Sequence, residues 1–295
     1  MRYFKAFHPG MICKGKQYAE NTVYEENGNA ICKEGVMHFC KTPFDCLDYY
    51  PLVGNDGRVT EFAEVEPLDR VLEGKNKCAC RKLRIGAKLS LKDFINAQVD
   101  IQMEKGACDT AASGKWSKLA ASGDGSQLAA SGNWSQLAAS GDESQLAASG
   151  DWSKLAASGD ESQLAASGDG SKLAASGNWS QLAASGKWSK LAASGDGSKL
   201  AASGEWSQLA ASGNWSQLAA SGNWSKLAAS GAHSIAAAIG RNSAASASLG
   251  SWIVLAEYDD NNEPICVKAA QIDGEKLKPN VFYQLKGGEF VEASE

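Results

Sequence analysis

The sequence lacks the long apolar runs that mark a secretory signal or a membrane span. Met1 to Lys5 is followed by His8-Pro9-Gly10, not by the apolar segment that a signal peptide needs. No stretch reaches the roughly 20 apolar residues of a transmembrane helix. These absences predict a cytoplasmic protein with reduced cysteines and no membrane partner.

The central part of the chain also lacks an excess of charge of either sign. Residues 111–249 carry 9 acidic and 9 basic residues, whereas a nucleic-acid-binding surface needs clustered Lys and Arg. A protein that mimics DNA would instead need a continuous row of carboxylate side chains. The net charge of −5 arises in residues 250–295, which carry 9 acidic and 4 basic residues. We therefore expect no nucleic-acid partner.

The sequence has no catalytic motif strong enough to name a reaction. The glycines at its centre are not a phosphate-binding loop, because no Lys-Ser/Thr follows them in a strand–Gly–helix context. His38 and Cys40 would point the same way on a strand, so a nucleophile–base pair stays open beside a core histidine. We expect no cofactor, and we favour a non-enzymatic protein while leaving an enzyme as the alternative.

Seven of the eight cysteines lie in the first 110 residues. Four residues there could ligate zinc, although their spacing matches no standard knuckle or finger. Buried structural thiols are the other interpretation of the same residues. The candidate metal ligands are Cys32, His38, Cys40 and Cys46.

A nine-residue repeat fills the centre of the chain. Gly114, Gly123 and Gly132 begin a series that continues without a slip to Gly240, and the unit reads Ala-Ala-Ser-Gly-x-x-Ser-(Lys/Gln)-Leu. A fixed short period is typical of solenoids. Glycine and two serines in each unit disfavour helices, and collagen is excluded because glycine is not every third residue.

Each unit is expected to contain one turn, at Ser-Gly-x-x, and one short strand. Alternation places Ser117, Leu119 and Ala121 inside, and the variable Lys/Gln position outside. Nine residues cannot close a coil, so we predict a parallel β-solenoid, a flat β-roll with two units in each 18-residue coil and about seven coils. Its core leucines are Leu119, Leu128, Leu137, Leu146, Leu155, Leu164, Leu173, Leu182, Leu191, Leu200, Leu209, Leu218 and Leu227.

Pairing of units in an 18-residue coil would bring tryptophans together on one edge. The sixth position of the even units is Trp in six of seven units, against two of seven in the odd units. The sequence therefore predicts an aromatic ladder, which could staple the coils, join two rods, or stack on a ligand. The ladder residues are Trp116, Trp134, Trp152, Trp188, Trp206 and Trp224.

The flanking segments have ordinary globular composition. In residues 1–110 we expect an α+β capping domain, with strands near Tyr3–Phe7, Val36–Phe39 and Phe62–Val65, a helix over Thr42–Tyr50, and a second helix that starts with a capping box at Ser90. Residues 111–250 form the solenoid. Residues 251–295 are expected to form a small β cap built on a hairpin.

The flanks carry a family resemblance. Cys32 to Cys40, then Pro43, Asp45 and Tyr49-Tyr50, resemble an uncharacterised domain of phage and prophage proteins, which precedes short Ala-Ser-Gly-Asp repeats there. Trp252 to Glu257 is similar to the cap that follows such repeats. The resemblance implies a phage-related setting, in a bacterial host cell or on a virion, and carries no known activity.

Two classes of function therefore remain. The preferred one is a structural or binding solenoid that associates with itself, as a homo-oligomer or filament, through the tryptophan edge. The alternative is an enzyme or small-ligand-binding N-terminal domain that the solenoid spaces or oligomerises. Flat faces of small Ala and Ser side chains also resemble ice-binding surfaces, although those usually present ranks of Thr.

Overall fold

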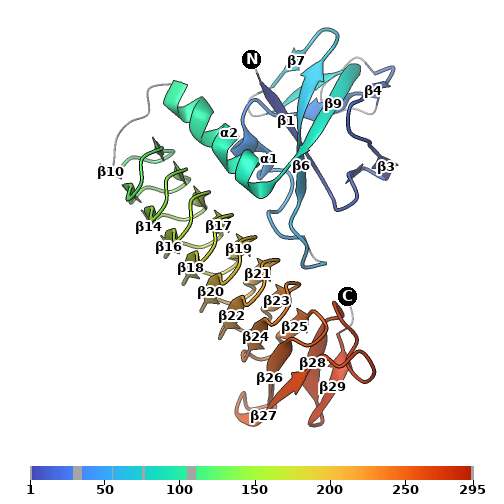
Figure 1. Ribbon diagram of the computed structural model, residues 1–295, viewed down its shortest axis with the longest axis vertical. Helices are drawn as coiled ribbons and strands as arrows, with labels where there is room; N and C mark the ends of the chain where they lie inside the picture. The colour runs from blue at the N-terminus through green and yellow to red at the C-terminus, as the bar shows by residue number, and fades with distance from the viewer. Residues whose placement is uncertain (1, 29–34, 55, 75–76, 105–110, 294–295) are drawn as a thin grey trace.

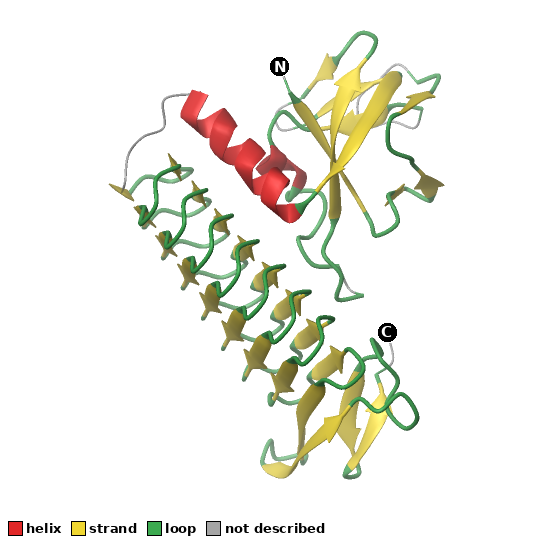
Figure 2. Cartoon of the chain, in the orientation of Figure 1, coloured by secondary structure: helices red, strands yellow, loops and turns green. Residues whose placement is uncertain are grey.

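The computed structural model describes residues 2–28, 35–54, 56–74, 77–104 and 111–293. The fold is mainly β, as predicted, with a parallel β-solenoid at its centre. An α+β domain lies along one side of the solenoid, and a small β cap closes its far end (Figures 1 and 2). Within the described part of the chain, no helix is long and apolar enough to cross a membrane.

Each coil contains 18 residues, because every strand pairs in parallel with the strand two units further along. Leu137 lies opposite Leu155, and Leu146 lies opposite Leu164 on the other side of the coil. This register confirms the predicted pairing of two repeats in one flat coil.

The solenoid strands form two sheets. The first, which we name the open sheet, contains β10 (Ala111–Ala112), β12 (Gln127–Ala130), β14 (Gln145–Ala148), β16 (Gln163–Ala166), β18 (Gln181–Ala184), β20 (Lys199–Ala202), β22 (Gln217–Ala220), β24 (Ile235–Ala238), β26 (Trp252–Tyr258) and β27 (Pro264–Gln271). The second, the docked sheet, contains β11 (Lys118–Ala121), β13 (Gln136–Ala139), β15 (Lys154–Ala157), β17 (Lys172–Ala175), β19 (Lys190–Ala193), β21 (Gln208–Ala211), β23 (Lys226–Ala229), β25 (Ala244–Ala247), β28 (Tyr283–Lys286) and β29 (Glu289–Glu292).

The interior of each coil holds one leucine, one alanine and one serine from each unit. All thirteen repeat leucines are at most 2% exposed, and each contributes about 2 kcal/mol by leaving water. The buried serine hydroxyl donates to the carbonyl of the glycine three residues earlier, as Ser162 does to Gly159 at 2.9 Å. The inward serine is therefore satisfied locally, which removes the cost of burying a hydroxyl.

Close backbone contact between successive coils explains the invariant glycine. A Cβ atom on Gly195 would lie 2.1 Å from the carbonyl oxygen of Gly177 in the preceding coil. Side-chain oxygens add a second link between the turns: the backbone N–H of Asp160 donates to Asp142 Oδ1 at 2.8 Å. The same link, over 18 residues, recurs in the turns where Asp or Asn occupies the acceptor position.

The solenoid is longer than the sequence predicts, with about eight coils instead of seven. The degenerate units after Leu227 still form full strands, because Ala236 and Ala245 take the inward positions of leucine. The cap begins inside the open sheet: β26 pairs in parallel with β24, and only then does the hairpin partner β27 run antiparallel. On the docked sheet, β28 pairs antiparallel with β25 and ends the parallel array.

The N-terminal domain is built on antiparallel sheets. Its main sheet has the order β1-β6-β9-β4, formed by Tyr3–Phe7, Glu61–Pro67, Lys82–Leu89 and Thr22–Glu25. A smaller sheet has the order β5-β8-β7, formed by Met37–Phe39, Cys78–Cys80 and Leu72–Glu73. β2 (Ile12–Cys13) and β3 (Lys16–Gln17) form a hairpin.

Two helices complete this domain. The helix predicted over Thr42–Tyr50 is shorter, since α1 spans Pro43–Cys46. Thr42 caps it as predicted, but the N–H groups of Tyr49 and Tyr50 both turn back to the carbonyl of Cys46, and Pro51 follows. α2 spans Leu91–Glu104 and starts at the predicted capping box, in which the N–H of Asp93 donates to Ser90 Oγ at 3.1 Å.

The invariant glycine gives a matched test of the coil contact. We expect Gly195→Ala to lower the free energy of unfolding by about 3 kcal/mol, because the new methyl group overlaps backbone that cannot move aside. Gly123→Ala is the control: this glycine belongs to the first coil, and a Cβ there meets nothing nearer than 3.9 Å. Denaturant unfolding followed by circular dichroism would measure both, and equal effects would contradict the contact.

Candidate functional site

The tryptophans occupy a strained backbone position in the turns. Eight of the nine, all except Trp252, have φ between 53° and 65°, the left-handed region that a bulky residue enters at a cost of about 1–2 kcal/mol. Other units place glycine at the same position, at Gly125, Gly170 and Gly197, with φ of 65–66°. The turn therefore needs a left-handed residue but does not need an indole ring.

On the even edge three pairs of rings stack between successive coils. Trp116 and Trp134 lie 5.1 Å apart between ring centroids, Trp134 and Trp152 lie 5.5 Å apart, and their planes are within 14° of parallel. Trp206 and Trp224 stack in the same way at 5.1 Å. The six side chains still expose 37–55% of their surface.

Gly170 interrupts the even edge and divides it into two groups of three. The ring of Trp152 lies over Gly170, where a Cβ atom would approach a ring carbon to 2.6 Å. The first group also lines a groove of about 300 Å³ beside α1, together with Asp45, Asp48 and Lys154. Burial raises the pKa of the Asp45 carboxyl there. The two groups therefore face different surroundings.

The odd edge carries fewer rings and more carboxylates. Trp179 is 60% exposed, and Trp215 stacks on His233 with ring centroids 6.0 Å apart. Glu143 and Glu161 occupy the ring position in other coils, and their φ values are 57° and 56°. This edge has no continuous row of tryptophans.

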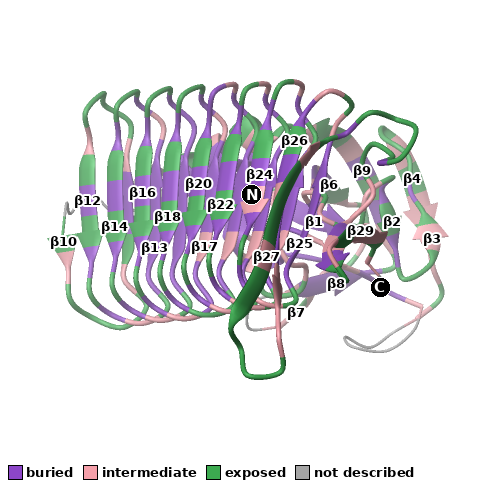
Figure 3. Cartoon of the chain, turned by 90° about the horizontal axis from the view of Figure 1, so that it is seen from below, coloured by how far each residue is buried: buried purple, intermediate pink, exposed green. Residues whose placement is uncertain are grey.

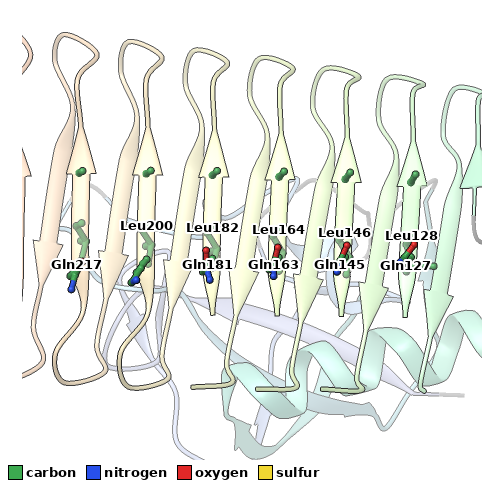
Figure 4. Close-up of a pocket in the computed structure, with 18 of the residues that line it drawn as sticks. Gln127, Leu128, Gln145, Leu146, Gln163, Leu164, Gln181, Leu182, Leu200 and Gln217 are labelled. Atoms are coloured by element: carbon green, nitrogen blue, oxygen red, sulfur yellow. The ribbon is translucent and has the colours of Figure 1, made fainter. Parts of the chain in front are cut away.

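The open sheet presents a flat face of small and amide side chains. The first residue of each strand (Gln, or Lys199 in β20) and the first Ala point outward, so that exposed and buried residues alternate along the open-sheet strands from β12 to β22 (Figure 3). Shallow grooves lie on both sides of the central alanine row. Figure 4 shows one of them, in which Gln127, Gln145 and Gln163 form a rank along the sheet.

The N-terminal domain covers the opposite face. The outward alanines of the docked sheet are buried, and Ala138, Ala156 and Ala192 are at most 1% exposed. They form one apolar cluster with Phe44 and Phe94. The predicted outward positions are therefore buried on this sheet only. Alanine leaves room for α2 and for the segment after α1 to lie close against the strands.

Lysines of the docked sheet hold α1 in place. Lys154 Nζ donates to the carbonyl of Phe44 at 2.7 Å and to Asp48 Oδ1 at 2.8 Å, and Lys172 Nζ donates to the carbonyl of Leu47. Cations at the end of a helix satisfy its last carbonyl groups. Sequence reasoning placed these side chains outside and missed this role.

A signal for the docking was present in the repeat. The Lys/Gln position is Lys in five of the seven even units, at 118, 154, 172, 190 and 226, and only at Lys199 in the odd units. Three of these lysines, Lys154, Lys172 and Lys190, donate to carbonyl groups of the N-terminal domain. The glutamines of the open sheet face solvent instead. Because lysine is concentrated in alternate units, and so on one sheet, this pattern indicates which face of the solenoid another part of the chain covers.

The described candidate metal ligands do not form a three-ligand cluster, although the thiols of Cys40 and Cys46 contact each other. Cys32 lies outside the described residues. His38 is half-buried on β5, and Cys40 and Cys46 are buried; burial raises the pKa of the Cys46 thiol, which disfavours the thiolate that a metal binds. Among described residues, no three His, Cys, Asp or Glu side chains gather as a metal site would require.

Comparison with known proteins assigns a domain but no activity. Residues 1–97 match a family model described as a domain of unknown function, DUF7666. This match covers the N-terminal domain as far as the middle of α2. No curated protein and no solved structure matches the chain.

The docking lysines give a pH dependence that can be measured. Burial lowers the pKa of Lys172 from 10.5 to about 8, and the charge of Lys154 adds to this. Between these two values the unfolded chain binds more protons than the folded one, so stability should rise as the pH increases. We expect the free energy of unfolding of the wild type, measured with denaturant, to increase by about 1–3 kcal/mol across this pH interval.

The variant Lys172→Met should lose this increment, because the titrating group is gone. Lys199→Met is the control, since Lys199 occupies the same repeat position on the open sheet and is exposed. If Lys172→Met keeps the wild-type slope above pH 8, the lysine is not desolvated by the N-terminal domain.

Proposed function

We propose that this protein is a structural, non-enzymatic scaffold that binds a second copy of itself through the tryptophans of the even edge. The single observation that carries the proposal is that bulky indoles occupy a left-handed position where the same chain elsewhere uses glycine. Residues held in a costly conformation that the fold does not require point to a function.

Stacking within one rod does not account for the indoles by itself. A stacked aromatic pair contributes about 0.5–1.5 kcal/mol, whereas each left-handed indole costs about 1–2 kcal/mol relative to glycine. The stacking energy and the cost of the left-handed conformation nearly cancel, so replacing glycine by tryptophan adds little to the stability of an isolated solenoid. An interface that buries the exposed half of each ring would supply the missing free energy.

A second copy is the occupant that fits this edge. The rings repeat at the spacing of the coils, about 4.8 Å, and the same edge of another molecule has the same spacing. A two-fold arrangement would bring one patch against itself. The six rings expose roughly 400–700 Å², which approaches the ~800 Å² per partner of a stable interface once the neighbouring turn residues are added.

The biological setting belongs to the same proposal. A phage or prophage origin, in a host cell or on a virion, is supported by the resemblance of the N-terminal and C-terminal segments to proteins with short Ala-Ser-Gly-Asp repeats. A rod of near-identical coils, capped at one end and covered along one face, suits a component whose length and edge spacing matter more than any single residue.

The mass of the protein in solution tests the proposal. We expect light scattering to give a dimer or larger assembly of the 31.0 kDa chain, and a monomer when Trp134, Trp152, Trp188 and Trp206 are replaced by Gly. Glycine is the suitable replacement because it relieves the left-handed strain, so the variant should unfold at a similar denaturant concentration.

The matched control removes the two odd-edge tryptophans. Trp179→Gly with Trp215→Gly should leave the mass of the assembly unchanged. A wild-type monomer at high concentration would overturn the proposal, and so would an assembly that survives the four even-edge substitutions.

A further inference from the structure

The N-terminal domain contains a cavity that the scaffold proposal does not use. It has a volume of about 720 Å³ and lies between β1, β5, the β2–β3 hairpin and the end of α1. Pockets for small organic ligands have volumes of about 300–1,000 Å³. The side chains around it are unusual for a structural void, since four of them are lysines.

Lys5 is the most telling of these lysines. It lies on β1 and is only 4% exposed, with its Nζ donating to the carbonyl of His38 at 2.8 Å. The rings of Phe7 and Tyr18 lie 5.5 Å away on the same ammonium group. Among the described residues no carboxylate forms an ion pair with it. A buried ammonium without a counter-ion costs several kcal/mol, so an anion in the cavity would offset that cost.

The other three lysines surround the same space. Lys14 and Lys16 come from the β2–β3 hairpin, where Lys14 itself has a left-handed φ of 49°, and Lys77 lies 5.2 Å from the ring of Tyr49. Glu26 is the one carboxylate among the described lining residues, and it pairs with Lys16 at 3.0 Å. The described residues around the cavity therefore carry an excess of positive charge.

The electrostatic environment of His38 reflects this excess. Burial, followed by the charges of Lys14, Lys77 and Lys5, lowers its pKa to about 4, so the imidazole is neutral at pH 7. The histidine thus adds no further cation and remains able to form neutral hydrogen bonds.

Flat aromatic side chains line the remaining wall. His8 and Tyr50 lie with ring centroids 5.1 Å apart, and the hydroxyl of Tyr50 contacts Cys13 Sγ at 2.9 Å, which fixes the ring. Tyrosine and histidine rings are surfaces on which planar heterocycles stack. A cavity lined by lysines and aromatic rings favours a ligand that has both an anionic group and a planar ring.

We propose that this cavity binds a small phosphorylated compound with a planar ring, of the size of a mononucleotide. Its phosphate would lie near Lys5 and Lys14, and its ring would stack beside Tyr50 and His8. Ammonium groups bind phosphate through charge-assisted hydrogen bonds, and the enclosure around Lys5 strengthens them because water is largely excluded.

Calorimetry with three probes tests this inference on the full chain. We expect adenosine monophosphate to bind, adenosine to fail because it lacks the charge, and inorganic phosphate to bind at least about ten-fold more weakly because it lacks the ring, which corresponds to ~1.4 kcal/mol. Equal affinity for phosphate and the nucleotide would overturn the planar-ring contact. Absence of binding by both at millimolar concentration would overturn the site.

Two variants locate the binding. Lys14→Gln removes an exposed lysine and should weaken nucleotide binding about ten-fold without affecting the fold. Lys92→Gln, on the exposed side of α2, is the control and should bind as the wild type does. If Lys14→Gln leaves the affinity unchanged, the nucleotide does not bind in this cavity.

Discussion

The close approach of glycine backbone between successive coils is the constraint on which the rest of the structure depends. A side chain at Gly195 would reach within 2.1 Å of the carbonyl of Gly177, and the same contact recurs in every coil after the first. It keeps the coils at strand spacing, which aligns the leucines, closes the turn ladders and sets the distance between the stacked rings. Side chains on each edge and face of the solenoid therefore repeat at the spacing of the coils.

Within that constraint, the positions of the repeat have separate roles. The recurring serine and leucine fill the interior of the coil, with alanine taking the place of leucine in the last units. The recurring glycine makes the contact between successive coils. The outward position after the turn is free to vary, and its lysines on the docked sheet bind the carbonyl groups of Phe44 and Leu47. The left-handed position is free as well, and there the choice among Gly, Glu and Trp decides the character of each edge.

The N-terminal domain acts as a lateral cover of the solenoid. Its α2 helix and the segment after α1 hide the alanine face of the docked sheet, so that the exposed surface of the solenoid is reduced to the open sheet and the two edges. The lysine-lined cavity lies on the domain itself and not in that interface. The proposed self-association through the even edge and the proposed ligand binding in the cavity are compatible, because they use different surfaces.

Much of the fold follows from local rules that can be applied to the sequence. The period of nine, the inward leucine and the segregation of tryptophans in alternate units predict the 18-residue coil and its even edge, since strand alternation and coil spacing are set by backbone geometry. The N-caps at Thr42 and Ser90 are equally local. The metal hypothesis for Cys32, His38, Cys40 and Cys46 had no such support, nor did the nucleophile–base hypothesis for His38 and Cys40, because spacing along the chain does not fix distances between elements. Only the tertiary structure decided that the N-terminal domain lies along one sheet, that Lys154 and Lys172 bind it, and that Lys5 is buried at a cavity. These features depend on contacts between residues 33 to 125 positions apart, which local sequence patterns do not predict.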